Sequence, residues 1–241
     1  YINAVKYILS LPDNDSHLAD GAAFERIRLV CDILGSPQKK PINVHICGDV
    51  GKSSCFTMLE AILSHSHNSF GHYSFDSKND IRECISVNKK PVSHAEFADA
   101  VKEISKIYKL RFQGITPHRG EIMILVAASC FANHACTVAI YEKKAIKNDP
   151  ANALDIPALS FIAPLFDRHI SAETLESLVH KGTLETVSCL QHKEVYNAIS
   201  DTCALSGSRL TVPIYSDMEI KSITFLRTTF TYRGGEYSVR S

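Results

Sequence analysis

The chain has 241 residues, 45% of them hydrophobic and 22% charged, which is enough to bury the core of one large domain or two small ones. Lysine plus arginine and aspartate plus glutamate number 26 each, so no strong basic field points to a nucleic-acid partner. No apolar run approaches the length that spans a membrane, and no secretory signal pattern is present. We therefore expect a cytoplasmic protein that binds neither membrane nor nucleic acid.

Hydrophobic periodicity and end signals predict the elements in chain order. Helices are expected within residues 2–11, 21–37, 53–66, 92–110, 120–135, 171–182 and 193–207. Short apolar runs predict strands within residues 42–47, 70–75, 136–142, 157–166, 186–190 and 209–215. The last segment, 223–241, predicts a β-hairpin that turns at Gly234 and Gly235.

This alternation of strands and helices predicts an α/β fold with a mostly parallel sheet flanked by helices and a small β-hairpin near the C-terminus. There is no internal repeat and no low-complexity linker, so residues 1–241 are expected to form a single domain. The segment 148–157 is the best candidate for a long functional loop.

The eight cysteines form no C-x-x-C pair, which argues against a zinc ribbon or a redox motif. Most of them lie inside apolar runs such as "RLVCDIL" and "AASCFAN". They are therefore expected to be buried, reduced thiols.

The stretch "NVHICGDVGKSSCFTMLEAIL" carries the chemistry. It is a predicted strand, a glycine turn and a predicted helix, which together can offer backbone N–H groups and a helix N-terminus to a phosphate. A lysine supplies a cation, and a serine hydroxyl at the helix start can bind Mg²⁺. The predicted nucleotide-binding residues are Gly48, Asp49, Val50, Gly51, Lys52, Ser53 and Ser54.

The spacing differs from the usual P-loop, which has a further glycine five residues before the Gly-Lys pair. Ile46 occupies that position, so the turn follows a shorter G-x-x-G-K-S form. Two other interpretations remain open. In the first, the turn is only a tight strand–helix connection whose Lys52 faces water. In the second, it belongs to a P-loop NTPase of another kind.

The residues around this turn resemble folylpolyglutamate synthase/dihydrofolate synthase, of the Mur ligase superfamily. The family hallmark H-V-A-G-T-N-G-K-G-S is similar to the stretch from His45 to Ser54. The flanks agree as well: "FERIRLVCDILGSPQ" precedes the turn, "NDIRECISVNKKPVSHAEF" follows it, and "FTYRGGEY" lies near the end. The resemblance covers nearly the whole chain, but only the ATPase half of the family.

The resemblance implies roles for single residues. Gly48, Gly51 and Lys52 match the phosphate-binding positions, and Lys52 would be catalytic. The metal ligands implied are Ser54, Glu142 and His169, with Arg168 standing between His169 and Asp167. Lys181 matches a catalytic lysine that the family carbamylates, with the spacing offset by about two residues; it is otherwise an exposed lysine near a helix end.

Several motifs depart from the family. Its T-S-P-H loop is replaced by residues 74–77, where Asp76 is a substitute metal ligand at best. Its glycine-rich segment becomes residues 142–150, with lysines at 143, 144 and 147 that are expected to be a solvated run or to bind an anion. His45 is expected to be a packed core histidine.

The implied function is the ATP-binding portion of an ATP-dependent folate–glutamate ligase. The cofactors would be ATP and Mg²⁺, the partner a folate-type small molecule, and an acyl phosphate would precede amide bond formation. The alternative is a non-catalytic nucleotide-binding or scaffolding module that kept the fold and lost the chemistry. The family's carboxy-terminal domain has no counterpart in residues 1–241, so either that domain or a protein partner would be needed for ligation.

Overall fold

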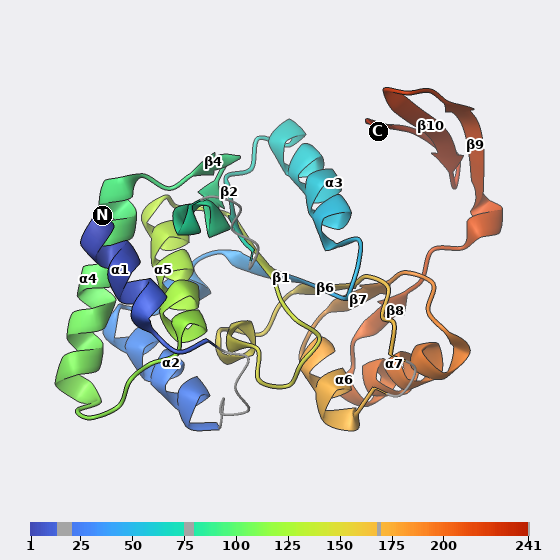
Figure 1. Ribbon diagram of the computed structural model, residues 1–241. Helices are drawn as coiled ribbons and strands as arrows, with labels where there is room; N and C mark the ends of the chain where they lie inside the picture. Colours follow the sequence, from blue (N-terminus) through green and yellow to red (C-terminus); the bar gives the residue numbers. More distant parts are fainter. Residues whose placement is uncertain (14–20, 75–79, 168–169, 241) are drawn as a thin grey trace.

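The computed structural model describes residues 1–13, 21–74, 80–167 and 170–240 (Figure 1). Its helices are α1 (Ile2–Ser10), α2 (Gly21–Ile33), α3 (Lys52–His65), α4 (His94–Arg111), α5 (Arg119–Asn133), α6 (Ala172–Leu178) and α7 (Lys193–Ser206). Its strands are β1 (Ile42–Cys47), β2 (Phe70–Tyr73), β3 (Ile85–Val87), β4 (Lys90–Pro91), β5 (Val138–Glu142), β6 (Leu159–Ile162), β7 (Glu185–Ser188), β8 (Arg209–Thr211), β9 (Met218–Ile223), β10 (Arg227–Tyr232) and β11 (Gly235–Arg240).

Within the described residues, eight strands form one sheet in the order β4-β3-β2-β5-β1-β6-β7-β8. The six neighbouring strands β2-β5-β1-β6-β7-β8 pair in parallel. Strands β3 and β4, at one edge of the described sheet, pair antiparallel to their neighbours. The prediction of an α/β fold with a mostly parallel sheet is confirmed. In such a sheet, the residues that follow neighbouring strands gather at the carboxyl edge, which is where ligands bind.

The helices cover the two faces of the sheet unequally. Helix α3 lies on one face, where Val44, Ile46 and Ile140 pack against its side chains. On the other face, Cys47 packs with α6 and α7, and Tyr141 packs in a larger core built from α1, α2, α4 and α5. Successive residues of β1 and β5 thus point into different cores, as the alternation of strand side chains requires.

The boundaries of β1 agree with the predicted strand 42–47. Each predicted helix is present and at most a few residues shorter than expected, except α6, which ends at Leu178 instead of near residue 182. The C-terminal prediction needs correction. The hairpin turns at Arg233 and Gly234, both with positive φ, rather than at Gly234 and Gly235. Strand β9 adds a third member, and the small sheet β11-β10-β9 stands away from the main sheet (Figure 1).

The segment 148–157 is not an open loop. It holds a short 3-10 helix, η3 (Pro150–Ala153), in which Pro150, Ala151 and Ala153 are buried against the main core. The thiols match expectation: all eight cysteines are free, and six of them are buried. None of the described helices combines the length and apolarity needed to cross a bilayer.

A buried charge network joins the helices of the larger core. The carboxylate of Glu121 on α5 accepts hydrogen bonds from Arg26 at 2.9 and 3.0 Å and from the Tyr108 hydroxyl at 2.9 Å. It also accepts from the backbone N–H of His118 at 3.0 Å, which closes the capping box of α5. One carboxylate therefore ties α2, α4 and α5 together.

Replacing Glu121 with alanine is expected to destabilise the fold by about 3–5 kcal/mol, because Arg26 loses its buried counter-charge and Tyr108 its acceptor. Glu121→Gln keeps the shape and one acceptor, so we expect a smaller loss. Urea unfolding of both variants beside the parent chain checks this. Equal stability of Glu121→Ala and the parent would contradict a structural role for the network.

Candidate functional site

The predicted glycine turn is present between β1 and α3, at the carboxyl edge of the sheet. Gly48 has φ +127° and lies so close to the end of β6 that a Cβ atom would stand 2.8 Å from the Ala163 carbonyl oxygen. Gly51 has φ +83° and is the N-cap of α3. Both glycines therefore occupy positions that other residues adopt only with strain.

The first turn of α3 is available to an anion. No described side chain caps this helix end, and Ser53 and Ser54 are exposed there. Backbone N–H groups in the first turn of a helix have no partner within the helix, and the helix dipole favours negative charge near them. The Lys52 ammonium folds back over the turn and donates a hydrogen bond of 2.6 Å to the Gly48 carbonyl oxygen.

Asp49 and Val50, between the two glycines, are exposed. The backbone N–H of Asp49 donates to the Pro164 carbonyl oxygen at 2.9 Å, and its carboxylate accepts from the Phe166 N–H at 2.7 Å. Asp49 therefore anchors the segment that follows β6 to the turn. Its assignment to nucleotide binding stays a prediction, as do those of the other residues of the turn.

Glu142 is the last residue of β5 and lies opposite Ile46 of β1, two residues before the turn begins. Its carboxylate is nearly buried and lies 3.0 Å from Nε2 of His72, on the neighbouring strand β2. The ring of Phe56, from α3, stacks on the His72 ring with centroids 3.4 Å apart. The strand pairing thus brings an acidic and an imidazole side chain together beside the turn.

His72 did not stand out in the sequence. The signal that could have identified it is its place near the end of a strand that neighbours β5, because side chains at the carboxyl edge of adjacent parallel strands meet.

Lys143 corrects one expectation, because it is fully buried and not part of a solvated run. Its ammonium donates to the side-chain oxygen of Asn152 at 2.8 Å and to the Ser177 carbonyl oxygen, and Nε2 of His180 is 3.2 Å away. Lys144 and Lys147 are exposed, as expected. Lys143 points to the face opposite the one on which Glu142 lies, since it is the next residue along the strand direction.

A group of buried titratable side chains surrounds this ammonium. Burial and, secondarily, Lys143 lower the pKa of His180 to about 3, and the same two causes lower the pKa of His45. Burial raises the pKa of Asp149 to about 6, against the hydrogen bonds that its carboxylate accepts. Burial also lowers the pKa of Lys143 itself. His45 is a buried core histidine, as expected, and neither of its ring nitrogens has a hydrogen-bond partner among the described residues.

The other predicted site residues are either exposed or outside the described residues. Lys181 is exposed, beyond the end of α6. His169 and Arg168 lie outside the described residues, as does Asp76. Among the described residues, no group of three or more His, Cys, Asp or Glu side chains could hold a metal ion.

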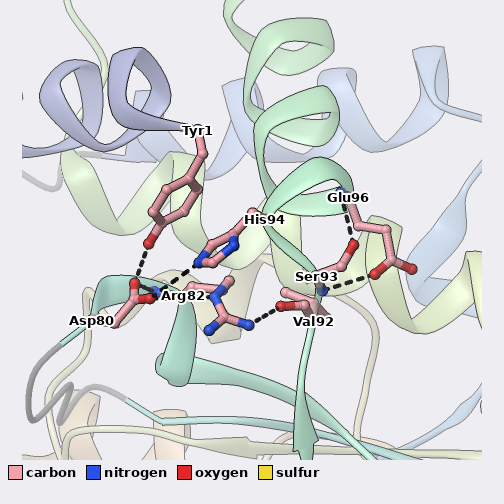
Figure 2. A network of polar contacts seen from close by, with 7 residues as sticks. All are labelled: Tyr1, Asp80, Arg82, Val92, Ser93, His94 and Glu96. Atoms are coloured by element: carbon pink, nitrogen blue, oxygen red, sulfur yellow. Dashed lines mark hydrogen bonds and ion pairs between the residues drawn. The ribbon is translucent and has the colours of Figure 1, made fainter.

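A separate polar network fixes the chain where it returns from β2 toward α4 (Figure 2). Asp80 accepts hydrogen bonds from the Tyr1 hydroxyl and from the Arg82 backbone and side chain, and Arg82 donates to the Val92 carbonyl oxygen at 2.5 Å. Burial acts to raise the pKa of Asp80, but the hydrogen bonds from Tyr1 and Arg82 outweigh it and lower the pKa. The network holds the segment after residue 79 in place.

The capping box predicted at the start of α4 is present beside it. Ser93 accepts from the Glu96 N–H at 3.2 Å, and Glu96 accepts from the Ser93 N–H at 2.8 Å (Figure 2). These two bonds satisfy backbone donors that the helix start would otherwise leave unpaired.

Comparison with known proteins agrees with the resemblance seen in the sequence. No family model matches the chain. A dihydrofolate synthase/folylpolyglutamate synthase of Mycobacterium tuberculosis is 28% identical over 155 residues, which cover 60% of this chain and 32% of that protein. The chain thus spans about a third of the length of that curated relative.

Solved structures carry the same fold. Folylpolyglutamate synthase of M. tuberculosis, complexed with ADP and AMPPCP, matches with a TM-score of 0.81 and 19% identity over 98% of this chain and 56% of that one. The enzyme of Thermotoga maritima matches with a TM-score of 0.82 and 22% identity, again over 98% and 56%. The fold of this chain is therefore that of the N-terminal part of folylpolyglutamate synthases.

Proposed function

We propose that this chain is the ATP-binding portion of an ATP-dependent ligase that joins a folate-type carboxylate to glutamate. The observation that carries the proposal is the glycine turn from Gly48 to Gly51, which joins β1 to α3 and stands beside the carboxylate of Glu142. Its support is the sequence similarity to a dihydrofolate synthase/folylpolyglutamate synthase, together with the shared fold.

In this proposal the protein contributes mainly electrostatics. A carboxylate oxygen of the folate-type substrate attacks the γ-phosphorus of ATP, and the bond from that phosphorus to the bridging oxygen breaks, releasing ADP. The amine of glutamate then attacks the acyl carbon, and phosphate leaves. Lys52 and the N–H groups at the start of α3 stabilise the charge of the transferring phosphoryl group.

Two described residues beside the turn offer oxygen ligands of the kind that Mg²⁺ prefers. The Glu142 carboxylate is nearly buried, and among the described residues its hydrogen-bond partner is the His72 imidazole. The Ser54 hydroxyl is exposed in the first turn of α3. Glu142 and Ser54 would hold Mg²⁺, which would neutralise phosphate charge when bound. His169 would be a further metal ligand, and Lys181 a catalytic lysine.

The structural relatives are longer than this chain. We propose that the glutamate-binding part belongs to a further stretch of polypeptide or to a separate protein, and that residues 1–241 act as one ATP-binding domain.

Replacing Lys52 with alanine is expected to weaken ATP binding about 10- to 100-fold, because one charge-assisted contact contributes about 1.5–3 kcal/mol. Calorimetric titration with ATP and Mg²⁺ measures this. Lys109→Ala, on α4, removes an equal charge far from the turn and should leave the affinity unchanged. Equal affinity in the parent and Lys52→Ala would remove the basis of the proposal.

One observation favours a second candidate, a non-catalytic nucleotide-binding module. The Glu142 carboxylate already has the His72 imidazole as a hydrogen-bond partner, so it is not left unpaired without a metal ion. Saturable ATP binding without ADP formation, in the presence of folate and glutamate, would favour this module over the ligase.

A further inference from the structure

The side chains of His72 and Glu142 form a close, nearly buried pair next to the glycine turn. Nε2 of His72 and Oε1 of Glu142 are 3.0 Å apart, and their side chains are 12% and 6% exposed. The two residues come from adjacent parallel strands and point to the face that α3 covers. The pair therefore lies under the helix whose first turn is the candidate phosphate site.

The imidazole is held in a fixed orientation. The Phe56 ring stacks on it in a nearly parallel arrangement, with an interplanar angle of 11°. Phe56 lies four residues after Lys52 and two after Ser54 in α3, so the ring contact ties His72 directly to the helix that carries them. An orientation set by packing leaves Nε2 directed at the carboxylate.

This distance suits two ligands of a single ion. Nitrogen and oxygen ligands stand about 2.0–2.2 Å from a transition metal, and two of them in neighbouring octahedral positions are therefore about 3 Å apart. An ion bound by both atoms would replace the hydrogen bond that Nε2 of His72 and the Glu142 carboxylate share, with the two atoms as its neighbouring ligands.

We propose that Nε2 of His72 and the carboxylate of Glu142 form the protein half of a divalent-cation site that takes Mn²⁺, Co²⁺ or Zn²⁺ in preference to Mg²⁺. Imidazole suits such transition metals, whereas Mg²⁺ demands oxygen ligands in a nearly ideal octahedron. Among the described residues no third His, Cys, Asp or Glu completes the site. The Ser54 hydroxyl and phosphate oxygens of the nucleotide would then supply the remaining ligands, a feature that rests on the proposed function.

The experiment uses Mn²⁺ as the probe, with the non-hydrolysable nucleotide AMPPCP. Pulsed electron paramagnetic resonance of bound Mn²⁺ detects coupling to a directly bound nitrogen, which a purely structural role of His72 would not produce. The expected result is a nitrogen coupling in the parent chain that His72→Leu abolishes. The leucine preserves an apolar contact with Phe56.

Calorimetry supplies the second readout. His72→Leu should lower the affinity for Mn²⁺ relative to that for Mg²⁺ by about tenfold or more, a typical effect of losing one support of a metal site. His65→Leu, which removes an exposed histidine from the end of the same α3, should change neither readout.

Two results would overturn the proposal. One is bound Mn²⁺ that shows no nitrogen coupling in the parent chain. The other is Mn²⁺ binding that is equal or tighter in the folded His72→Leu variant, which would make His72 a counter-ion that competes with metal. The titration is repeated with Mn²⁺ alone at high concentration. Nitrogen coupling there, in a chain that binds no AMPPCP, would support the metal pair and refute only the proposed function.

Discussion

The variant Gly48→Ala is expected to lose nucleotide binding and to unfold more easily than the parent chain. The added Cβ would stand 2.8 Å from both the carbonyl oxygen and the Cβ of Ala163, and φ at this residue is +127°. Overpacking and backbone strain each cost about 1–3 kcal/mol. Relief of the clash would move the turn away from β6 and misalign the N–H groups at the start of α3. Calorimetric titration with ATP and urea unfolding measure the two effects.

Gly207 supplies the matched control. It also has a positive φ, +75°, but a Cβ there would meet nothing within 4 Å. Gly207→Ala should therefore show a modest loss of stability and full ATP affinity. Unchanged ATP affinity in folded Gly48→Ala would mean that the close approach to Ala163 is irrelevant to the site.

The second large effect is a loss of stability in acid caused by the buried cluster around Lys143. The unfolded chain binds protons at His45 and His180 below pH 6.5, the ordinary imidazole value, whereas the folded chain resists this until about pH 3 at His180. Because the pKa values of both histidines are lower in the folded chain than in the unfolded chain, the fold is more stable above pH 6.5 and loses that stability as the pH falls. Asp149 acts in the opposite sense, because its folded carboxyl binds a proton near pH 6 and its unfolded carboxyl near 3.8.

Two imidazoles outweigh one carboxyl, so unfolding takes up about one net proton at this cluster between pH 6 and 4. Stability should therefore fall by about 1.4 kcal/mol per pH unit from this source. His180→Gln should reduce the slope by that amount, and His65→Gln, an exposed histidine, should not change it. Urea unfolding at a series of pH values tests the difference. An identical slope in His180→Gln and the parent would show that His180 titrates normally in the folded chain.

The parts of the fold set by local pattern were predictable. Strand β1 is a run of apolar and β-branched residues followed by glycine, and its boundaries agree with prediction. The capping box of Ser93 and Glu96 marked the start of α4 in the same way. Strands β3, β4 and β9 were missed because they are short or mostly exposed, so neither length nor alternation of apolar residues marks them.

Only the part of the site that is formed by consecutive residues was predictable. The turn from Gly48 to Gly51 is a motif in sequence, whereas the pairing of His72 with Glu142 depends on which strands become neighbours. Lys143 was misjudged because a run of lysines indicates solvent by composition alone. In the structure its backbone N–H donates to the Ile46 carbonyl oxygen, which prolongs the strand pairing and turns the side chain inward.

Helix α3 has no fully buried side chain, and Met58 and Ile62 on its outer side are exposed. Sparse burial gives a helix a low free energy of local opening, so we expect the amide hydrogens of α3 to exchange readily. A nucleotide bound at its first turn would bind the closed helix and not the open one. Ordering the helix would then reduce the observed affinity below the intrinsic affinity. Nucleotide binding at the turn would slow amide hydrogen exchange along all of α3.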